Sequence, residues 1–221
     1  MGENRERDRA FLLDEIESEL RSTCGMTGRE SLSPQVAQAL LKVPRHAFVP
    51  REVEWAAYRN MALPIGHRQT ISQPFVVALM TDLLDPGPDD VVLEVGTGSG
   101  YQAAVLSCLV KQVYSLEIVG ELAVLAQERL QRLGFVNVEV REGDGCLGWA
   151  EHAPYDSIIV TAAAARIPKA LIEQLRPGGA IVAPLGEPQA TQDLVVLRKD
   201  ENGRIRERFV LPVVFVPLRD A

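Results

Sequence analysis

Residues 92–101 read VLEVGTGSGY, in which a short apolar strand leads directly into three glycines at alternate positions. Glycine lets the backbone turn tightly and approach a ligand closely, because no Cβ stands in the way. The N–H groups of a helix that follows such a turn point toward a ligand in the same crevice. The stretch therefore predicts a site for a nucleotide or nucleoside cofactor, and the alternative is a glycine-rich turn without a ligand.

The spacing of these glycines separates two kinds of cofactor site. A dinucleotide site has the pattern G-x-G-x-x-G, in which the third glycine lets the helix pack on the strand. This chain has G-x-G-x-G, and Tyr101 stands where that third glycine would fall. The pattern disfavours a pyrophosphate site and resembles motif I of the methyltransferases that use S-adenosylmethionine (SAM), where the glycines face an amino-acid tail and a ribose.

The composition fits a globular protein with a sizeable core. The chain has 221 residues, of which 47% are hydrophobic and 24% charged, and its formal net charge is −7. This charge argues against non-specific binding of nucleic acid. No apolar run is long enough to span a membrane, and the charged N-terminus lacks the apolar segment of a signal peptide. The three cysteines are too widely spaced for a disulfide framework or a metal site, so we expect a reduced, cytoplasmic protein without a metal.

From residue 88 onward, the predicted strands and helices alternate. The expected strands are 91–95, 113–116, 136–141, 157–161 and 180–184, and the helices between them are 101–110, 120–133 and 169–175. Such alternation predicts a Rossmann-like, doubly wound, mostly parallel sheet. Two further strands, 194–198 and 213–217, have no helix between them and are separated by an Asn-Gly turn, so the sheet is expected to end antiparallel.

The residues before 88 predict helices and no separate domain. Helices are expected over 9–21, from Ser33-Pro34 to Pro44, and over 75–84, with a short helix at 53–58 in an otherwise irregular segment. We interpret residues 1–87 as an N-terminal helical cap and residues 88–221 as a SAM-binding α/β core, which together form one integrated domain.

Residues that follow the strands are candidates for binding, because ligands of an open α/β sheet bind at the carboxyl ends of its strands. Glu117 follows the second strand, and its carboxylate can accept hydrogen bonds from both hydroxyls of a ribose; the alternative is a surface glutamate. Asp144 lies between two glycines and suits either a tight turn or capture of an adenine amino group. The small residues from Thr161 onward leave room for a substrate or for the reactive end of the cofactor.

Two hydroxyl residues, Thr70 and Ser72, precede the predicted helix 75–84 and can present their side chains to the same crevice. The alternative for Ser72 is that it caps that helix. The three histidines lie far apart in the sequence and have no spacing typical of metal ligands or of a catalytic triad.

Over residues 31–219 the chain resembles the protein-L-isoaspartate O-methyltransferase family. The segments that carry the resemblance are VPRHAFV (43–49), ALPIG (62–66), QTISQP (69–74), LEVGTGSGYQ (93–102), YDSIIVTAA (155–163), LRPGG (175–179) and FVPL (215–218). The Thr-Ile-Ser loop is specific to this family, whereas methyltransferases in general share the glycine motif. Two residues depart from the family pattern: Arg68 replaces the glycine that usually precedes the loop, and Val214 stands where bacterial members often have arginine.

The resemblance implies that the chain transfers a methyl group from SAM to the free carboxylate of an L-isoaspartyl (or D-aspartyl) residue in damaged proteins, with S-adenosyl-L-homocysteine as product. The methyl ester would then collapse to a succinimide, which returns some damaged sites to aspartate. A carboxylate with a pKa of about 4 is already ionised at neutral pH and needs no base. The implied partners are isoaspartyl peptides and proteins, and we expect a monomer.

The resemblance also assigns roles to single residues. Ser72 is the implied catalytic residue, and the implied substrate-binding residues are Thr70, Ile71 and Ser72. Gly96 and Gly98 would admit the methionine tail of SAM, Glu117 would hold its ribose, and Asp144 with Gly145 would meet its adenine. The wider implied cofactor-binding set is Glu94, Thr97, Gly100, Gln102, Ile118 and Thr161.

Three other functions are weighed against this one. A SAM-dependent O-methyltransferase that acts on another carboxylate or small molecule is disfavoured by the Thr-Ile-Ser loop. An NAD-dependent oxidoreductase is disfavoured by Tyr101 in the glycine motif. A SAM-binding protein without catalytic activity is the third alternative, which Arg68 in the substrate loop leaves open.

Overall fold

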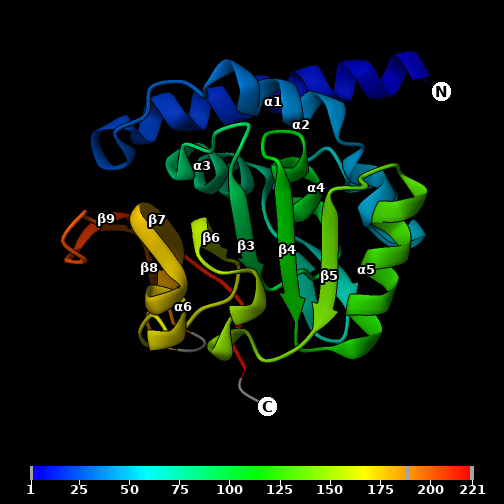
Figure 1. Cartoon of the computed structure of the whole chain (residues 1–221). Helices are drawn as coiled ribbons and strands as arrows, with labels where there is room; N and C mark the ends of the chain where they lie inside the picture. Colours follow the sequence, from blue (N-terminus) through cyan, green and yellow to red (C-terminus); the bar gives the residue numbers. More distant parts are fainter. Residues whose placement is uncertain (1, 188–189, 220–221) are drawn as a thin grey trace.

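The computed structural model describes residues 2–187 and 190–219. Residues 1, 188, 189, 220 and 221 lie outside the described residues, although the predicted ranges 1–87 and 88–221 include them. A seven-stranded sheet with the order β5-β4-β3-β6-β7-β8-β9 forms the centre of the molecule (Figure 1). Its strands are β3 (Val91–Val95), β4 (Gln112–Glu117), β5 (Val138–Glu142), β6 (Tyr155–Val160), β7 (Leu175–Leu185), β8 (Gln192–Lys199) and β9 (Ile205–Val213).

The sheet is parallel from β5 to β7 and antiparallel from β7 to β9. The helices are α1 (Gly2–Thr27), α2 (Pro34–Lys42), α3 (Pro74–Leu84), α4 (Tyr101–Ser107), α5 (Gly120–Arg132) and α6 (Lys169–Gln174). The predicted fold class is confirmed, including the antiparallel end of the sheet and the N-terminal helices. Because β3 lies between β4 and β6, the strand order reverses there, which opens a crevice at the carboxyl ends of these strands. None of the described helices is long and apolar enough to cross a membrane.

The central strands are buried on both faces. Val92 of β3 belongs to the hydrophobic cluster that α1 to α5 cover, whereas its neighbour Leu93 belongs to a second cluster with α6 on the opposite face. A strand that is covered on both faces has a continuous apolar sequence, because alternate side chains enter two different cores. This explains why VVLEV is recognisable as a strand from its sequence.

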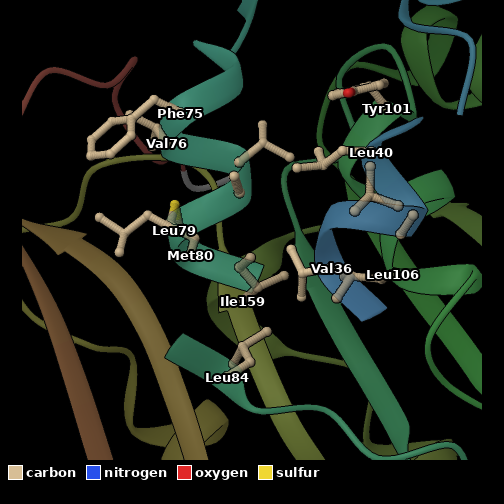
Figure 2. Close-up of a cluster of buried hydrophobic side chains, with 14 of the residues drawn as sticks. Val36, Leu40, Phe75, Val76, Leu79, Met80, Leu84, Tyr101, Leu106 and Ile159 are labelled. Carbon is tan, nitrogen blue, oxygen red and sulfur yellow. The ribbon is translucent and has the colours of Figure 1, made fainter. Parts of the chain in front are cut away.

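Helix α3 joins the N-terminal helices to the sheet. Every residue of Pro74–Leu84 is buried, and the helix lies between the outer helices α1 and α2 and the strands β6 and β7. Figure 2 shows the cluster, in which Val36 and Leu40 of α2 lie beside the side chains of α3 and near Ile159 of β6. A helix that is apolar on all sides is stable only inside a core. Consequently the cap and the sheet share one hydrophobic cluster.

Several elements differ from the sequence-based expectation; for example, β7 begins at Leu175 and not at residue 180, and α4 ends at Ser107 and not at residue 110. Helix α1 spans Gly2–Thr27 and is longer than 9–21, because the apolar stripe marks only the part that packs and the helix continues beyond the stripe at both ends. The last strand is β9, Ile205–Val213, and the expected 213–217 is wrong: most of β9 is an exposed, charged edge strand without apolar alternation. A hairpin of β1 (Leu63–Gly66) and β2 (Gln69–Ile71), which begins at the end of the segment 48–65 that was expected to be irregular, was not predicted.

Candidate active site

A cavity lies at the carboxyl ends of β3, β4 and β6, where the strand order reverses. The glycine loop after β3, Glu117 at the end of β4 and Thr161 after β6 line it. The end of the β1–β2 hairpin and the segment that follows β9 complete its wall. This is the location that the strand-end argument predicts.

The glycine loop approaches its neighbours so closely that side chains would not fit. Gly96 has a φ of 99°, and a Cβ there would collide with Thr161 Oγ1. Gly145, which also lines the cavity, would place a Cβ against Val95 Cγ1. The backbone therefore borders the cavity directly at both positions, as close contact with a cofactor requires.

Glu117 is held rigidly at the edge of this cavity. Gly98 N–H donates to Oε2 at 2.7 Å, and Val119 N–H donates to Oε1 at 3.0 Å. The residue is 5% exposed, so it is not a surface glutamate. Each carboxylate oxygen accepts one backbone hydrogen bond and keeps acceptor capacity toward the cavity, which suits a diol such as that of ribose.

Glu94 supports the loop from below and does not line the cavity. It is completely buried, Ser115 Oγ donates to its Oε2, and Thr97 Oγ1 lies 2.6 Å from the same Ser115 oxygen. Burial raises the pKa of Glu94 to about 8, and the nearby Glu117 adds to this effect against the hydrogen bond from Ser115. The side chain is therefore a neutral acid at neutral pH, one that connects β3 to β4 beneath the glycines.

The other implied cofactor residues take different places. Thr97, Gly98, Gln102, Ile118, Gly145 and Thr161 line the cavity together with Gly96 and Glu117. Gln102 donates from Nε2 to Thr81 Oγ1 at 2.8 Å, and Thr161 Oγ1 donates to Gly96 O at 2.6 Å. Gly100 precedes α4 outside the cavity lining. Asp144 Oδ1 accepts the Cys146 N–H at 2.7 Å, so Asp144 forms the tight turn that places Gly145.

Thr70 and Ser72 stand between this cavity and a second depression, which we call the acceptor groove. Residues 60–62, the start of α3 and the end of β9 line the acceptor groove; Thr70, Ser72, Thr161 and Val216 line both spaces. Neither the Thr70 nor the Ser72 hydroxyl makes a hydrogen bond to another residue that the structure describes. The N-cap of α3 is Gln73 and not Ser72. Both hydroxyls are therefore available to a ligand at the junction.

The backbone before Thr70 is strained where the sequence departs from the family pattern. His67 and Arg68 form the turn between β1 and β2, and both have positive φ, 52° and 60°. Hairpin turns of this kind favour glycine at such positions. The glycine that the family usually carries here thus has a conformational reason, and Arg68 adopts the same backbone conformation at a cost.

Sequence reasoning missed the contribution of the last residues and of Arg45. Val216 to Arg219 close one side of the cavity, because Ala163 N–H donates to Val216 O at 2.8 Å and Leu218 N–H donates to Ala163 O at 2.7 Å. The sequence FVPL (215–218) marked this segment as part of the family pattern, but it did not indicate that the segment closes the cavity. Arg45 is completely buried and donates to Ala57 O and Met61 O, which fixes the segment before the hairpin.

A Rossmann-like sheet with G-x-G-x-G spacing after a central strand, a buried carboxylate after the next strand and antiparallel strands at one edge is the architecture of a SAM-dependent methyltransferase. The family described as protein-L-isoaspartate(D-aspartate) O-methyltransferase matches residues 25–221 of this chain. The chain belongs to this family.

Similar proteins agree with the family match. Protein-L-isoaspartate O-methyltransferase 2 of Syntrophobacter fumaroxidans is 55% identical over 210 residues, which are 95% of this chain and 85% of that protein. Protein-L-isoaspartate O-methyltransferase 2 of a Polaromonas species is 52% identical over 207 residues, 94% of this chain and 98% of the relative.

Two solved structures have a similar fold. A protein-L-isoaspartate O-methyltransferase superposes with a TM-score of 0.82 at 26% identity; the match covers 96% of this chain and 66% of that one, slightly under two thirds of its length. A beta-aspartate methyltransferase from Plasmodium falciparum, solved in complex with S-adenosyl-L-homocysteine, has a TM-score of 0.76 at 23% identity, with 94% of this chain and 98% of that chain covered.

Proposed function

We propose that this chain methylates the free carboxylate of L-isoaspartyl (or D-aspartyl) residues in damaged proteins, with SAM in the cavity and the peptide in the acceptor groove. The observation that carries the proposal is that Thr70 and Ser72 line both spaces and keep their hydroxyls unbonded to described residues. A group held by these hydroxyls faces the cavity on one side and the groove on the other, as a methyl acceptor must.

Several residues suit SAM, which supplies an activated methyl group when bound. Gly96 and Gly98 would leave space for its methionine tail, and Glu117 would accept hydrogen bonds from its ribose hydroxyls. Gly145 and Ile118 would lie near the adenine. Close backbone at the glycines and a fixed carboxylate hydrogen-bonded to their loop are the two features of this chain that support the assignment.

The residues at the junction have to position the acceptor and remove water from it. The isoaspartyl carboxylate is ionised at neutral pH and is itself the nucleophile, so no general base is needed. Hydrogen bonds from Ser72 and Thr70 to one carboxylate oxygen would orient the other toward the methyl group. A new O–CH₃ bond forms as the S–CH₃ bond breaks, and the sulfur keeps the electron pair. Catalysis then consists mainly of alignment and desolvation.

The histidines support this view of the reaction, because none of them lines the cavity. His46 Nδ1 lies 2.7 Å from Tyr58 Oη, His67 is in the hairpin turn, and His152 stacks on Tyr114.

After methylation, the next backbone nitrogen displaces methanol from the ester to give a succinimide, which hydrolyses in part to aspartate.

We also propose that the protein acts as a monomer, since one chain supplies the whole site. We further propose that it is cytoplasmic, in keeping with the thiols Cys24 and Cys108.

The test is transfer of labelled methyl from SAM to a short isoaspartyl peptide and to its aspartyl twin. We expect labelling of the isoaspartyl peptide, and release of methanol as the ester collapses. Label on neither peptide, while calorimetry still detects SAM binding, would favour a methyltransferase for another acceptor or a SAM-binding protein without activity. Equal labelling of both peptides would contradict recognition of the isoaspartyl linkage.

A further inference from the structure

The acceptor groove carries one charged side chain among its described lining residues. That residue is Glu19 of α1, while Phe75, Val76 and Leu211 make much of the rest of the surface apolar. Val214, which is exposed, also lines the groove and adds no charge. A peptide that occupies the groove therefore meets one fixed sign of charge, and it is negative.

The carboxylate of Glu19 is held in place by neutral groups only. Asn60 Nδ2 donates to Oε2 at 2.7 Å, and Gln73 Nε2 donates to the same oxygen at 3.4 Å. Asn60 is itself fixed, because its Oδ1 accepts the Phe75 N–H at 3.0 Å. Glu19 forms no ion pair with any residue in the described part of the chain. Its charge is thus positioned but not neutralised.

Glu19 lies close to Ser72, where the acceptor carboxylate would be held. Gln73, one of its two donors, directly follows Ser72, so Glu19 lies one hydrogen bond away from the junction where the carboxylate is methylated. Helix α1 spans Gly2–Thr27, whereas the family match begins at residue 25. Glu19, the charged residue of the acceptor groove, therefore belongs to a helix that lies almost entirely outside the family match.

We propose that Glu19 is a specificity-determining residue that selects isoaspartyl peptides with a lysine or arginine close to the damaged residue. The proposal rests on the proposed function, because it takes the groove as the peptide site. A half-buried carboxylate without a cationic partner gains a charge-assisted hydrogen bond from an ammonium or guanidinium group. The same carboxylate repels an aspartate or glutamate of the peptide, in surroundings that screen charge less than bulk water does.

The experiment compares kcat/KM for isoaspartyl hexapeptides that differ at one flanking position at a time. Each flanking position carries in turn lysine, glutamine or glutamate, and the wild type is assayed at low ionic strength. We expect lysine to be preferred over glutamate by about tenfold at one flanking position, and much less at the others. This position dependence needs no variant, so it holds even if a substitution impairs folding.

Two variants separate the local charge from the charge of the whole protein. Glu19→Gln keeps an amide oxygen in place of the carboxylate oxygen that Asn60 bonds, and it removes the charge. Asp14→Asn also removes one negative charge, from an exposed residue of the same helix that does not line the groove. We expect the lysine-to-glutamate ratio at the selective position to fall to about twofold or less in Glu19→Gln and to stay at the wild-type value in Asp14→Asn.

Three results would decide against the inference. The first is a lysine-to-glutamate ratio of kcat/KM that is the same at every flanking position. The second is an unchanged ratio in Glu19→Gln, and the third is an equal fall of the ratio in Glu19→Gln and Asp14→Asn. Each would show that Glu19 does not select the flanking residue of the peptide. The failure of the proposed function is distinguishable, because then the wild type would not methylate even the glutamine-flanked isoaspartyl peptide. A urea unfolding curve for each variant accompanies the kinetics.

Discussion

Replacing Glu94 by glutamine is expected to make the free energy of unfolding less dependent on pH between about pH 5 and pH 8. The buried carboxyl keeps its proton until about pH 8, whereas in the unfolded chain it ionises near its ordinary pKa of 4.5. Between these values the folded state binds more protons than the unfolded state, so the free energy of unfolding falls as the pH rises. The stabilisation that is linked to the protonated Glu94 carboxyl is fully present below the pKa of this group in the unfolded chain. It is lost as the pH rises toward the pKa of the group in the folded protein.

The size of this effect follows from the two pKa values. Each pH unit between them lowers the free energy of unfolding by about 1.4 kcal/mol. From about pH 5 to about pH 8, Glu94 alone should therefore destabilise the wild type by about 3 to 4 kcal/mol. Glutamine has the same shape, offers an oxygen to the Ser115 hydroxyl and does not titrate.

Urea unfolding of the wild type and of Glu94→Gln, at several pH values from about 5 to 8, measures this difference. Other groups titrate equally in both proteins, so the quantity of interest is the free energy of the variant minus that of the wild type. It should rise by about 3 kcal/mol over the range. Glu139→Gln, which changes an exposed carboxyl on β5, is the control and should give a flat difference. A flat difference for Glu94→Gln as well would refute the view that Glu94 is buried as a neutral acid.

Substitutions at four further positions test the site and its supports. Ser72→Ala should lower kcat by about 100-fold and leave SAM affinity within about twofold; an unchanged kcat removes Ser72 from the mechanism. Glu117→Ala should weaken SAM binding by at least about tenfold by calorimetry, and Glu117→Gln by less, since it retains one oxygen acceptor; unaltered affinity in both rejects the ribose role. Arg68→Gly should raise the free energy of unfolding by about 1 kcal/mol, because glycine adopts positive φ without strain; a loss of stability would mean that the side chain compensates for the strain. Arg45→Met should lower it by about 2 to 4 kcal/mol, because the carbonyls of Ala57 and Met61 lose their donor in the core; a loss under about 1 kcal/mol would contradict this.

The position of the cavity at the strand ends could be predicted because its signals are local. A strand buried on both faces, such as VVLEV, is apolar throughout, and the glycines after it record a backbone that has no room for Cβ atoms. Glu117 could be placed by its position alone, since parallel strands bring their carboxyl ends to one edge of the sheet. Sequence position did not predict one feature. Glu94 is next to the glycines in sequence, but it lies beneath their loop and does not line the cavity.

The acceptor half could not be predicted in the same way, because its parts come from distant segments. Glu19, Asn60 and Val214 have no common spacing, and only the packing of α1 on α3 and β9 brings them to one groove. Charged residues on an outer helix are ordinarily solvent-facing, so nothing in the sequence around Glu19 distinguishes it from Asp14 on the same helix. The turn residues His67 and Arg68 gave no hairpin signal either, because the pair lacks the glycine that is typical of a two-residue hairpin turn.

The amino-acid sequence was thus sufficient for the α/β fold and for a cofactor cavity at the strand ends, because periodicity, glycine spacing and strand ends are properties of adjacent residues. The resemblance to a family, and not these patterns, implied a role for the loop 69–74. Only the tertiary structure decided that Thr70 and Ser72 lie at the junction of two spaces and that Glu19 borders one of them. The physical reason is that a cavity is bounded by elements brought together through burial of apolar surface across the whole chain, and this long-range packing leaves no pattern in any single segment.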